Sequence, residues 1–201
     1  MGMDLTHIYR VSPASKALGD YGVALFHGTV ERVDAAVRVN RPANDLPPLF
    51  LPYWSGWARK AIVVHRDHCE TLSQLDGLTF TRLLPGHMPE VPLAEYAAKK
   101  RVPRRRLDLA EGEPEGLLQS FPNSDRAIDA ASRLLLLHTP WQIAFQRSGE
   151  DLVLPRSAYP GGDLLCRENA GLFLTERGMR LLAPFLPTDW FRIEEHRVVD
   201  A

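Results

Sequence analysis

Apolar and polar positions follow a strand–helix–strand pattern in residues 171–198, and the rest of the chain is organised around this stretch. A short apolar run is followed by a helix that Thr175 can cap, a break at proline, and a second run with an aromatic pair. A looser copy of the pattern occupies residues 61–84, with Cys69, Leu72 and Leu75 at helical spacing. The chain is therefore predicted to be α+β, with a mixed sheet, few helices and two related strand–helix–strand units.

The N-terminal pattern predicts further strands. Residues 6–11 alternate polar and apolar side chains and predict a first strand, and residues 22–30 are a candidate for another. Residues 30–40 lack a clean period, so they fit either a second strand or a short helix.

Residues 124–138 form the clearest predicted helix. Ser124 can cap it, and apolar positions recur at i, i+3, i+4 and i+7 along its whole length. After it, residues 141–146 and 151–154 are strand candidates joined by a Ser148-Gly149 turn, which predicts a hairpin.

Residues 41–57 are rich in proline and aromatic side chains. Four prolines remove backbone donors, so no regular element is expected there. Trp54 and Trp57 could form a binding surface, because tryptophan offers a large contact area at low entropic cost. The alternative is that the aromatic rings of this segment close the edge of a core beneath an ordered loop.

Residues 99–118 carry a run of charge. A basic block that includes Arg104, Arg105 and Arg106 is followed at once by acidic residues, so the segment largely neutralises itself. We predict a solvated charged linker. A charged surface that faces a partner is the first alternative, and a nucleic-acid contact is the second.

Composition narrows the class of protein. The 201 residues are expected to form a single domain over residues 3–201, and 24 basic against 25 acidic side chains give no overall attraction to nucleic acid or anionic membrane. The two cysteines are expected as reduced thiols, with a single disulfide between them as the alternative. No apolar run is long enough for a membrane span and no secretory pattern precedes the first strand, so a cytoplasmic protein is expected.

Candidate chemistry is sparse. His65, His68 and Cys69 have spacings that suit a metal on a helix, but no second cluster supplies the remaining ligands, so no metal is expected. The chain has neither a nucleophile elbow nor a phosphate-binding glycine pattern. We therefore predict no catalytic residues, no cofactor and no enzyme activity.

Four short runs in the C-terminal part of the chain carry a resemblance. They are DLVL at 151–154, DLLCR at 163–167, LFLTER at 172–177 and WFRI at 190–193. In this order they resemble the C-terminal part of the double-CxxCG proteins of myxobacteria and of related bacterial immunity-protein families. Residues 61–84 resemble the earlier unit of the same families. The CxxC pairs of those families are missing, because this chain has no cysteine between residues 84 and 151, so no zinc knuckle is expected.

The resemblance implies an immunity protein that binds and neutralises a cognate bacterial toxin by stoichiometric protein–protein interaction. Its partner would be that toxin, encoded by a neighbouring gene. By side-chain type, Trp54 and Trp57 are the predicted anchors, and Arg104, Arg105 and Arg106 the predicted steering charges.

Two alternatives belong to other classes. One is an enzyme with a dispersed active site around His65, His68 and Cys69. The other is a nucleic-acid-associated regulator that uses the basic block, whose binding would depend steeply on salt.

Overall fold

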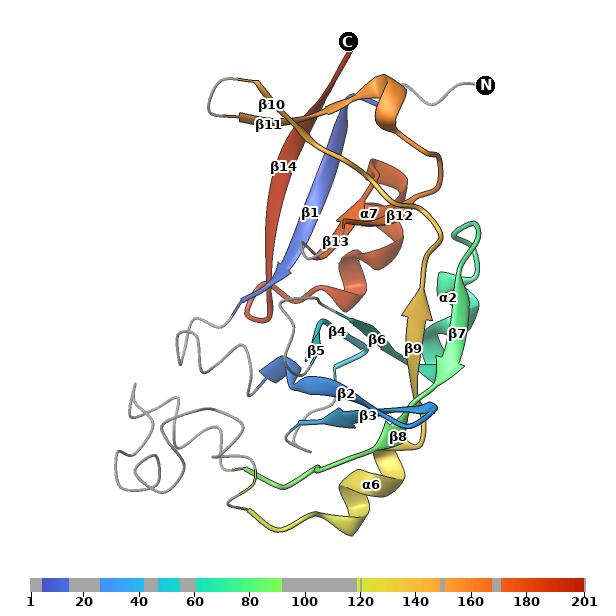
Figure 1. The fold of residues 1–201 in the computed structure, drawn as a ribbon, viewed down its shortest axis with the longest axis vertical. Coiled ribbons are helices and arrows are strands. Elements are labelled where there is room, and N and C mark those ends of the chain that lie inside the picture. The colour runs from blue at the N-terminus through green and yellow to red at the C-terminus, as the bar shows by residue number, and fades with distance from the viewer. Residues whose placement is uncertain are drawn as a thin grey trace, which may run out of the picture.

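In the part of the chain that the structure describes, strands predominate and form three sheets (Figure 1). The computed structural model describes residues 5–14, 26–41, 47–54, 61–91, 119, 121–148, 151–167 and 171–200. One sheet has six strands in the order β10-β11-β14-β1-β13-β12, and two have four strands in the orders β5-β2-β3-β8 and β4-β6-β9-β7. Both parallel and antiparallel pairs occur and the helices are few and short, which confirms the predicted α+β class.

The six-stranded sheet contains the C-terminal strand–helix–strand unit. Its strands are β1 (His7–Pro13), β10 (Gln146–Ser148), β11 (Asp151–Pro155), β12 (Leu164–Arg167), β13 (Gly171–Leu174) and β14 (Phe191–Val199). β13 and β14 are joined through helix α7 (Glu176–Leu182) and the short turn η3 (Ala183–Phe185). Both strands pair antiparallel with β1, which lies between them, so they run in the same direction. The unit is therefore a split β-α-β arrangement with the N-terminal strand inserted.

The earlier unit has the same arrangement in another sheet. That sheet consists of β4 (Leu49–Phe50), β6 (Ile62–His65), β7 (Thr79–Arg82) and β9 (Leu134–His138). Turn η1 (Arg66–His68) and helix α2 (Cys69–Leu72) connect β6 to β7, and both strands pair antiparallel with β9 between them. Here the inserted strand comes from later in the chain. The two predicted units are thus confirmed, and each is completed by a strand distant in sequence.

The remaining four-stranded sheet corrects two predictions. Residues 30–40 are neither one strand nor a helix, because β2 (Thr29–Val33) and β3 (Ala36–Asn40) form a hairpin whose turn holds Asp34 at φ 56°. An aspartate tolerates this left-handed conformation better than most side chains. The proline-rich segment does contain regular pairing, because β5 (Tyr53–Trp54) adds to β2 and β4 adds to β6. β8 (Leu84–Pro85) closes the sheet beside β3.

The predicted helix over residues 124–138 is wrong in its second half. Helix α6 covers Asp125–Ala131, and the Ser124 hydroxyl accepts the Ala127 amide as predicted. The following run is β9, which bonds to β6 on one side and β7 on the other. Four consecutive leucines fit a buried strand as well as a helix. Here the run forms a strand because β6 and β7 supply hydrogen-bonding partners on both sides.

The hairpin predicted after residue 140 is confirmed in part. β10 and β11 pair antiparallel, with Ser148 opposite Asp151. Residues 141–145 are not a strand, however, and only Gln142 forms an isolated bridge, with Cys166 of β12. A short turn, η2 (Arg156–Ala158), follows β11. The charged linker at 99–118 lies outside the described residues.

The two units share one hydrophobic core. Val64 of β6, Leu72 of α2, Leu172 of β13 and Leu182 of α7 belong to the same buried cluster, and helices α2 and α7 contact each other. A second cluster lies between β9, α6 and the β2–β3 hairpin, and a third on the face of the six-stranded sheet that carries Ile8. Among the described residues, no helix is long and apolar enough to cross a membrane.

Candidate functional site

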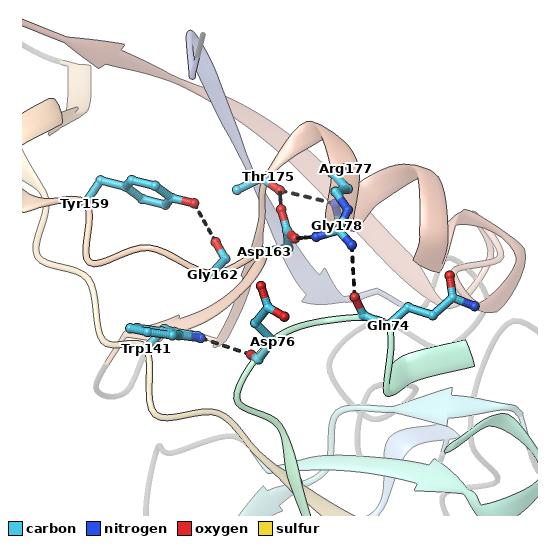
Figure 2. A network of polar contacts seen from close by, with 9 residues as sticks. All are labelled: Gln74, Asp76, Trp141, Tyr159, Gly162, Asp163, Thr175, Arg177 and Gly178. Atoms are coloured by element: carbon cyan, nitrogen blue, oxygen red, sulfur yellow. Dashed lines mark hydrogen bonds and ion pairs between the residues drawn. The ribbon is translucent and has the colours of Figure 1, made fainter. Parts of the chain in front are cut away.

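A polar network lies where the two units meet, and buried Asp163 is at its centre (Figure 2). Asp163 is 3% exposed. One carboxylate oxygen accepts the Thr175 hydroxyl at 2.5 Å, and the other accepts Nη1 of Arg177 in an ion pair. The Asp163 carbonyl also accepts the Thr175 amide at 3.1 Å.

The local sequence explains the contacts among Asp163, Thr175 and Gly178. β12 pairs with β13 so that Leu164 lies opposite Leu174, which places the residues just outside the pair, Asp163 and Thr175, side by side. Thr175 caps α7, because its hydroxyl oxygen accepts the Gly178 amide at 3.2 Å while its proton goes to Asp163. A side chain at position 178 would collide with the Asp163 carbonyl oxygen, so glycine is required by close approach.

Two contacts carry the network across to the earlier unit. Nη2 of Arg177 donates to the Gln74 carbonyl at 3.0 Å, and the Trp141 indole donates to the Asp76 carbonyl at 3.1 Å. Gln74 and Asp76 follow α2, so the end of that helix is tied to the start of α7. Gly162 lies directly against the Trp141 ring, and its carbonyl accepts the Tyr159 hydroxyl at 2.6 Å.

The hydrogen bonds of the network hold two parts of the chain together. Both carboxylate oxygens of Asp163 are engaged, and Arg177 is divided between a carboxylate and a carbonyl. Burial, with a smaller contribution from the nearby Asp163 carboxylate, raises the pKa of Tyr159, so its hydroxyl remains a donor at neutral pH. These groups join two parts of the chain, because Arg177 bonds to the Asp163 carboxylate in one and to the Gln74 carbonyl in the other.

A shallow polar hollow of about 180 Å³ opens beside this network. It is lined by Leu5, Thr6, His7, Tyr9, Thr175, Glu176, Arg177 and Arg180. Its cations are already paired, because Arg177 binds Asp163 and Arg180 lies 3.3 Å from the Glu176 carboxylate. The hollow therefore offers little net charge to an anion.

The three residues of the enzyme alternative take structural positions. The His65 ring accepts the Asp67 amide at 3.3 Å and so caps turn η1, while the His68 ring packs on Phe185 with centroids 4.8 Å apart. Cys69 packs against the shared core, and burial raises the pKa of its thiol. A raised pKa leaves less thiolate at neutral pH, which disfavours a nucleophilic role. Within the described ranges, no group of three or more His, Cys, Asp or Glu side chains is placed to hold a metal ion.

A hydroxyl–imidazole pair occurs on the surface of β7 and β9. Thr81 Oγ1 lies 2.9 Å from Nε2 of His138, and burial lowers the pKa of this histidine, which favours its neutral form. Both residues remain largely exposed on adjacent strands, so the burial that shifts this pKa is only partial. The pair is explained by cross-strand hydrogen bonding.

A buried cationic and aromatic cluster links Trp190 of the C-terminal unit to β4, in the sheet that contains the earlier unit. The Arg41 guanidinium, fully buried, lies 4.8 Å from the Phe50 ring centroid and 5.7 Å from that of Trp190. Nearby, His27 receives the Leu51 amide at Nδ1 and faces the Trp190 carbonyl with Nε2 at 2.9 Å. Phe50 thus belongs to the core. This agrees, for Phe50, with the interpretation that the aromatic rings of the proline-rich segment close the edge of a core.

Of the residues predicted to bind a partner, Trp54 lies within the described part of the chain. Trp54 ends β5, and its backbone pairs beside Val30 of β2. Trp57, Arg104, Arg105 and Arg106 lie outside the described residues. The positions of the predicted anchors and steering charges relative to one another therefore stay a prediction.

Sequence reasoning missed Asp163, Arg177 and Trp141 as members of one site. Thr175 was predicted only as a helix cap. The usable signal was the pair of apolar runs at 164–167 and 171–174, because a hairpin in this register places Asp163 beside Thr175. Comparisons of the chain with models of known protein families, with curated proteins and with solved structures found no match. The resemblance to the double-CxxCG proteins therefore stays a prediction.

Proposed function

We propose that this chain is a cytoplasmic immunity protein that neutralises a cognate bacterial toxin by binding it stoichiometrically. The proposal rests on an agreement between the sequence resemblance and the fold. The two stretches that resemble immunity-protein families, at 61–84 and within 151–198, are the ones that form matching split β-α-β units.

A protein that acts by binding needs a rigid scaffold and a complementary surface. The shared core and the Asp163 network supply rigidity, because they fix the two units to each other through buried contacts. A preorganised surface loses less conformational entropy on association, which favours tight binding. In this proposal Trp54 and Trp57 are the anchors, and Arg104, Arg105 and Arg106 steer an acidic partner surface.

Co-expression tests the proposal. The protein encoded by the neighbouring gene is produced alone and together with this chain, and growth is scored before co-purification. We expect the neighbour to be toxic alone, harmless with this chain, and recovered in a complex with it. A neighbour that is harmless alone, or that never associates with this chain, would overturn the proposal.

Matched variants locate the binding surface. Reversing Arg104, Arg105 and Arg106 to glutamate should slow association and abolish much of its salt dependence. The control reverses Arg82, Arg126 and Arg133, which are exposed arginines on β7, on α6 and at the turn before β9, and so adds the same charge elsewhere. Equal effects of the two triple variants would show that net charge, rather than the basic block, steers the partner.

A further inference from the structure

Among the described residues, nothing pairs with the outer edge of β14 along most of its length. β14 pairs with β1 from Phe191 to Arg197, whereas β11 reaches only Val198 and Val199 on the other side. Figure 1 shows β14 with β1 beside it, and the β10–β11 hairpin only near its upper end. Over residues 192–196, β14 is thus an edge strand.

The hydrogen bonds of β14 identify which backbone groups face this edge. The Val198 amide donates to Thr6, and the Trp190 carbonyl accepts from Ala14, so the even-numbered positions point toward β1. Because alternate residues of a strand point opposite ways, the amides and carbonyls of Ile193 and Glu195 point outward. Within the described part of the chain, no hydrogen bond engages these four groups.

The same edge carries an exposed apolar side chain. Ile193 is 40% exposed, and no other large hydrophobic residue of the described part of the chain is classed as exposed. An open edge with an exposed hydrophobic residue is a template for strand addition, which proteins usually prevent. The edge of β12 is protected in this way, because residues 141–143 bond to Cys166, and the exposed edge of β7 carries two threonines and an arginine.

The sequence of this edge is complementary to itself. If a second copy pairs antiparallel about a two-fold axis at Ile193, each Ile193 meets its counterpart. Arg192 then lies opposite Glu194 of the second copy, and the reciprocal pair repeats this contact. Within one chain Glu194 already pairs with Arg192 at 2.9 Å and with Arg10 at 3.1 Å, so the two-fold would join these ion pairs into one network. Opposite charges and apolar pairs across antiparallel strands are both stabilising. The Ile193 amide would reach the Ile193 carbonyl of the other copy, and the Glu195 amide its Phe191 carbonyl.

We propose that β14 is the interface of a symmetric homodimer, in which two six-stranded sheets join edge to edge through residues 191–195. The occupant is a second copy of this chain because register, charge and the exposed isoleucine agree on one two-fold axis. In this register the two positions that β11 covers, Val198 and Val199, lie opposite Thr188 and Pro187 of the second copy, which precede its β14. The proposal is independent of the toxin-binding function.

Sedimentation equilibrium of the full chain over a wide concentration range tests the dimer. We expect reversible dimerisation that Ile193→Glu weakens at least about tenfold, because it puts two like charges on the axis. Ile193→Val should remain dimeric. Thr79→Glu is the matched control, because it adds the same charge to β7, an exposed edge strand of a different sheet, and it should leave the dimer intact. A wild-type monomer at every concentration, or a dimer insensitive to Ile193→Glu, overturns the proposal.

Hydrogen exchange resolved to single amides tests the register. The Ile193 and Glu195 amides should gain protection as concentration rises, while the Arg192 and Glu194 amides stay protected throughout by β1. Dimerisation without this alternation would place the interface elsewhere and overturn the proposal. A monomer whose Ile193 and Glu195 amides exchange rapidly would leave the edge to a strand of another protein, which also overturns it.

Discussion

Asp163 combines burial, charge and position in a single side chain. It lies between the Thr175 cap and Arg177, and Arg177 in turn reaches the earlier unit through the Gln74 carbonyl. Burying a carboxylate is costly unless it is paired and hydrogen-bonded, and here both oxygens are satisfied. Removing the carboxylate should therefore affect the helix cap and the contact between the units together.

Asp163→Ala is expected to lower the free energy of unfolding by about 2–3 kcal/mol, because it leaves the Thr175 hydroxyl without its acceptor and frees Arg177. This is below the cost of breaking a fully buried pair, since the Arg177 side chain is 42% exposed. Urea unfolding measures the difference.

Glu176→Ala is the control for this experiment. Glu176 and Arg180 form an exposed pair one helical turn apart, whose loss should cost under about 0.5 kcal/mol. Equal losses for the two variants would contradict the role assigned to Asp163.

The two cysteines should be slow to react. Burial raises the pKa of both thiols, and at Cys166 this outweighs the hydrogen bond from Gln142, which acts in the opposite direction. A raised pKa means less thiolate at neutral pH, so the folded protein should react with a thiol reagent more slowly than glutathione does, and faster as pH rises. Unfolded protein should lose this protection. A native thiol that reacts faster than glutathione at neutral pH would revive the enzyme alternative around Cys69.

At the level of elements, β9 determines how the earlier unit folds. It is the central strand between β6 and β7, and it replaces the second half of a predicted helix. Leu136→Ala should destabilise the protein by about 2–4 kcal/mol, because the side chain is buried and its removal leaves a cavity. Thr79→Ala, on the exposed edge strand β7, should change stability by less than about 0.5 kcal/mol. Similar effects of both in thermal unfolding would contradict the central position of β9.

Elements set by local chemistry were predictable from the sequence. Ser124 and Thr175 cap their helices as predicted, because each cap needs only a hydroxyl and an amide within one turn. Gly77 ends the earlier helical segment with φ +75°, a conformation that favours glycine.

Elements set by distant partners were not predictable in this way. The Leu134–His138 run has a composition that suits a helix or a buried strand, and β6 and β7 select the strand. The β2–β3 hairpin turns at Asp34 without the asparagine–glycine signal that usually marks such turns. The candidate site escaped prediction for the same reason, since Arg177 meets Gln74 only after both units have formed.

For the whole molecule, the shared core implies that the two units unfold together. Leu72 and Leu182, one from each connecting helix, lie in the same buried cluster, so neither unit keeps its core if the other opens. Urea unfolding followed by far-ultraviolet circular dichroism and by tryptophan fluorescence should therefore give coincident curves. Trp141 bonds to Asp76 of the earlier unit, and Trp190 of the C-terminal unit lies against buried Arg41, so both indoles report on contacts between distant parts of the chain. Two separate midpoints would contradict the single domain expected from the sequence.

We propose that this chain neutralises a toxin by stoichiometric binding, and titration of the purified product of the neighbouring gene with this chain tests the proposal. The measured quantity is the loss of toxic activity. Neutralisation should be complete at one chain per toxin molecule and should not proceed further with time at lower ratios. Complete neutralisation at a small fraction of that ratio, increasing with time, would contradict the account and indicate an enzyme.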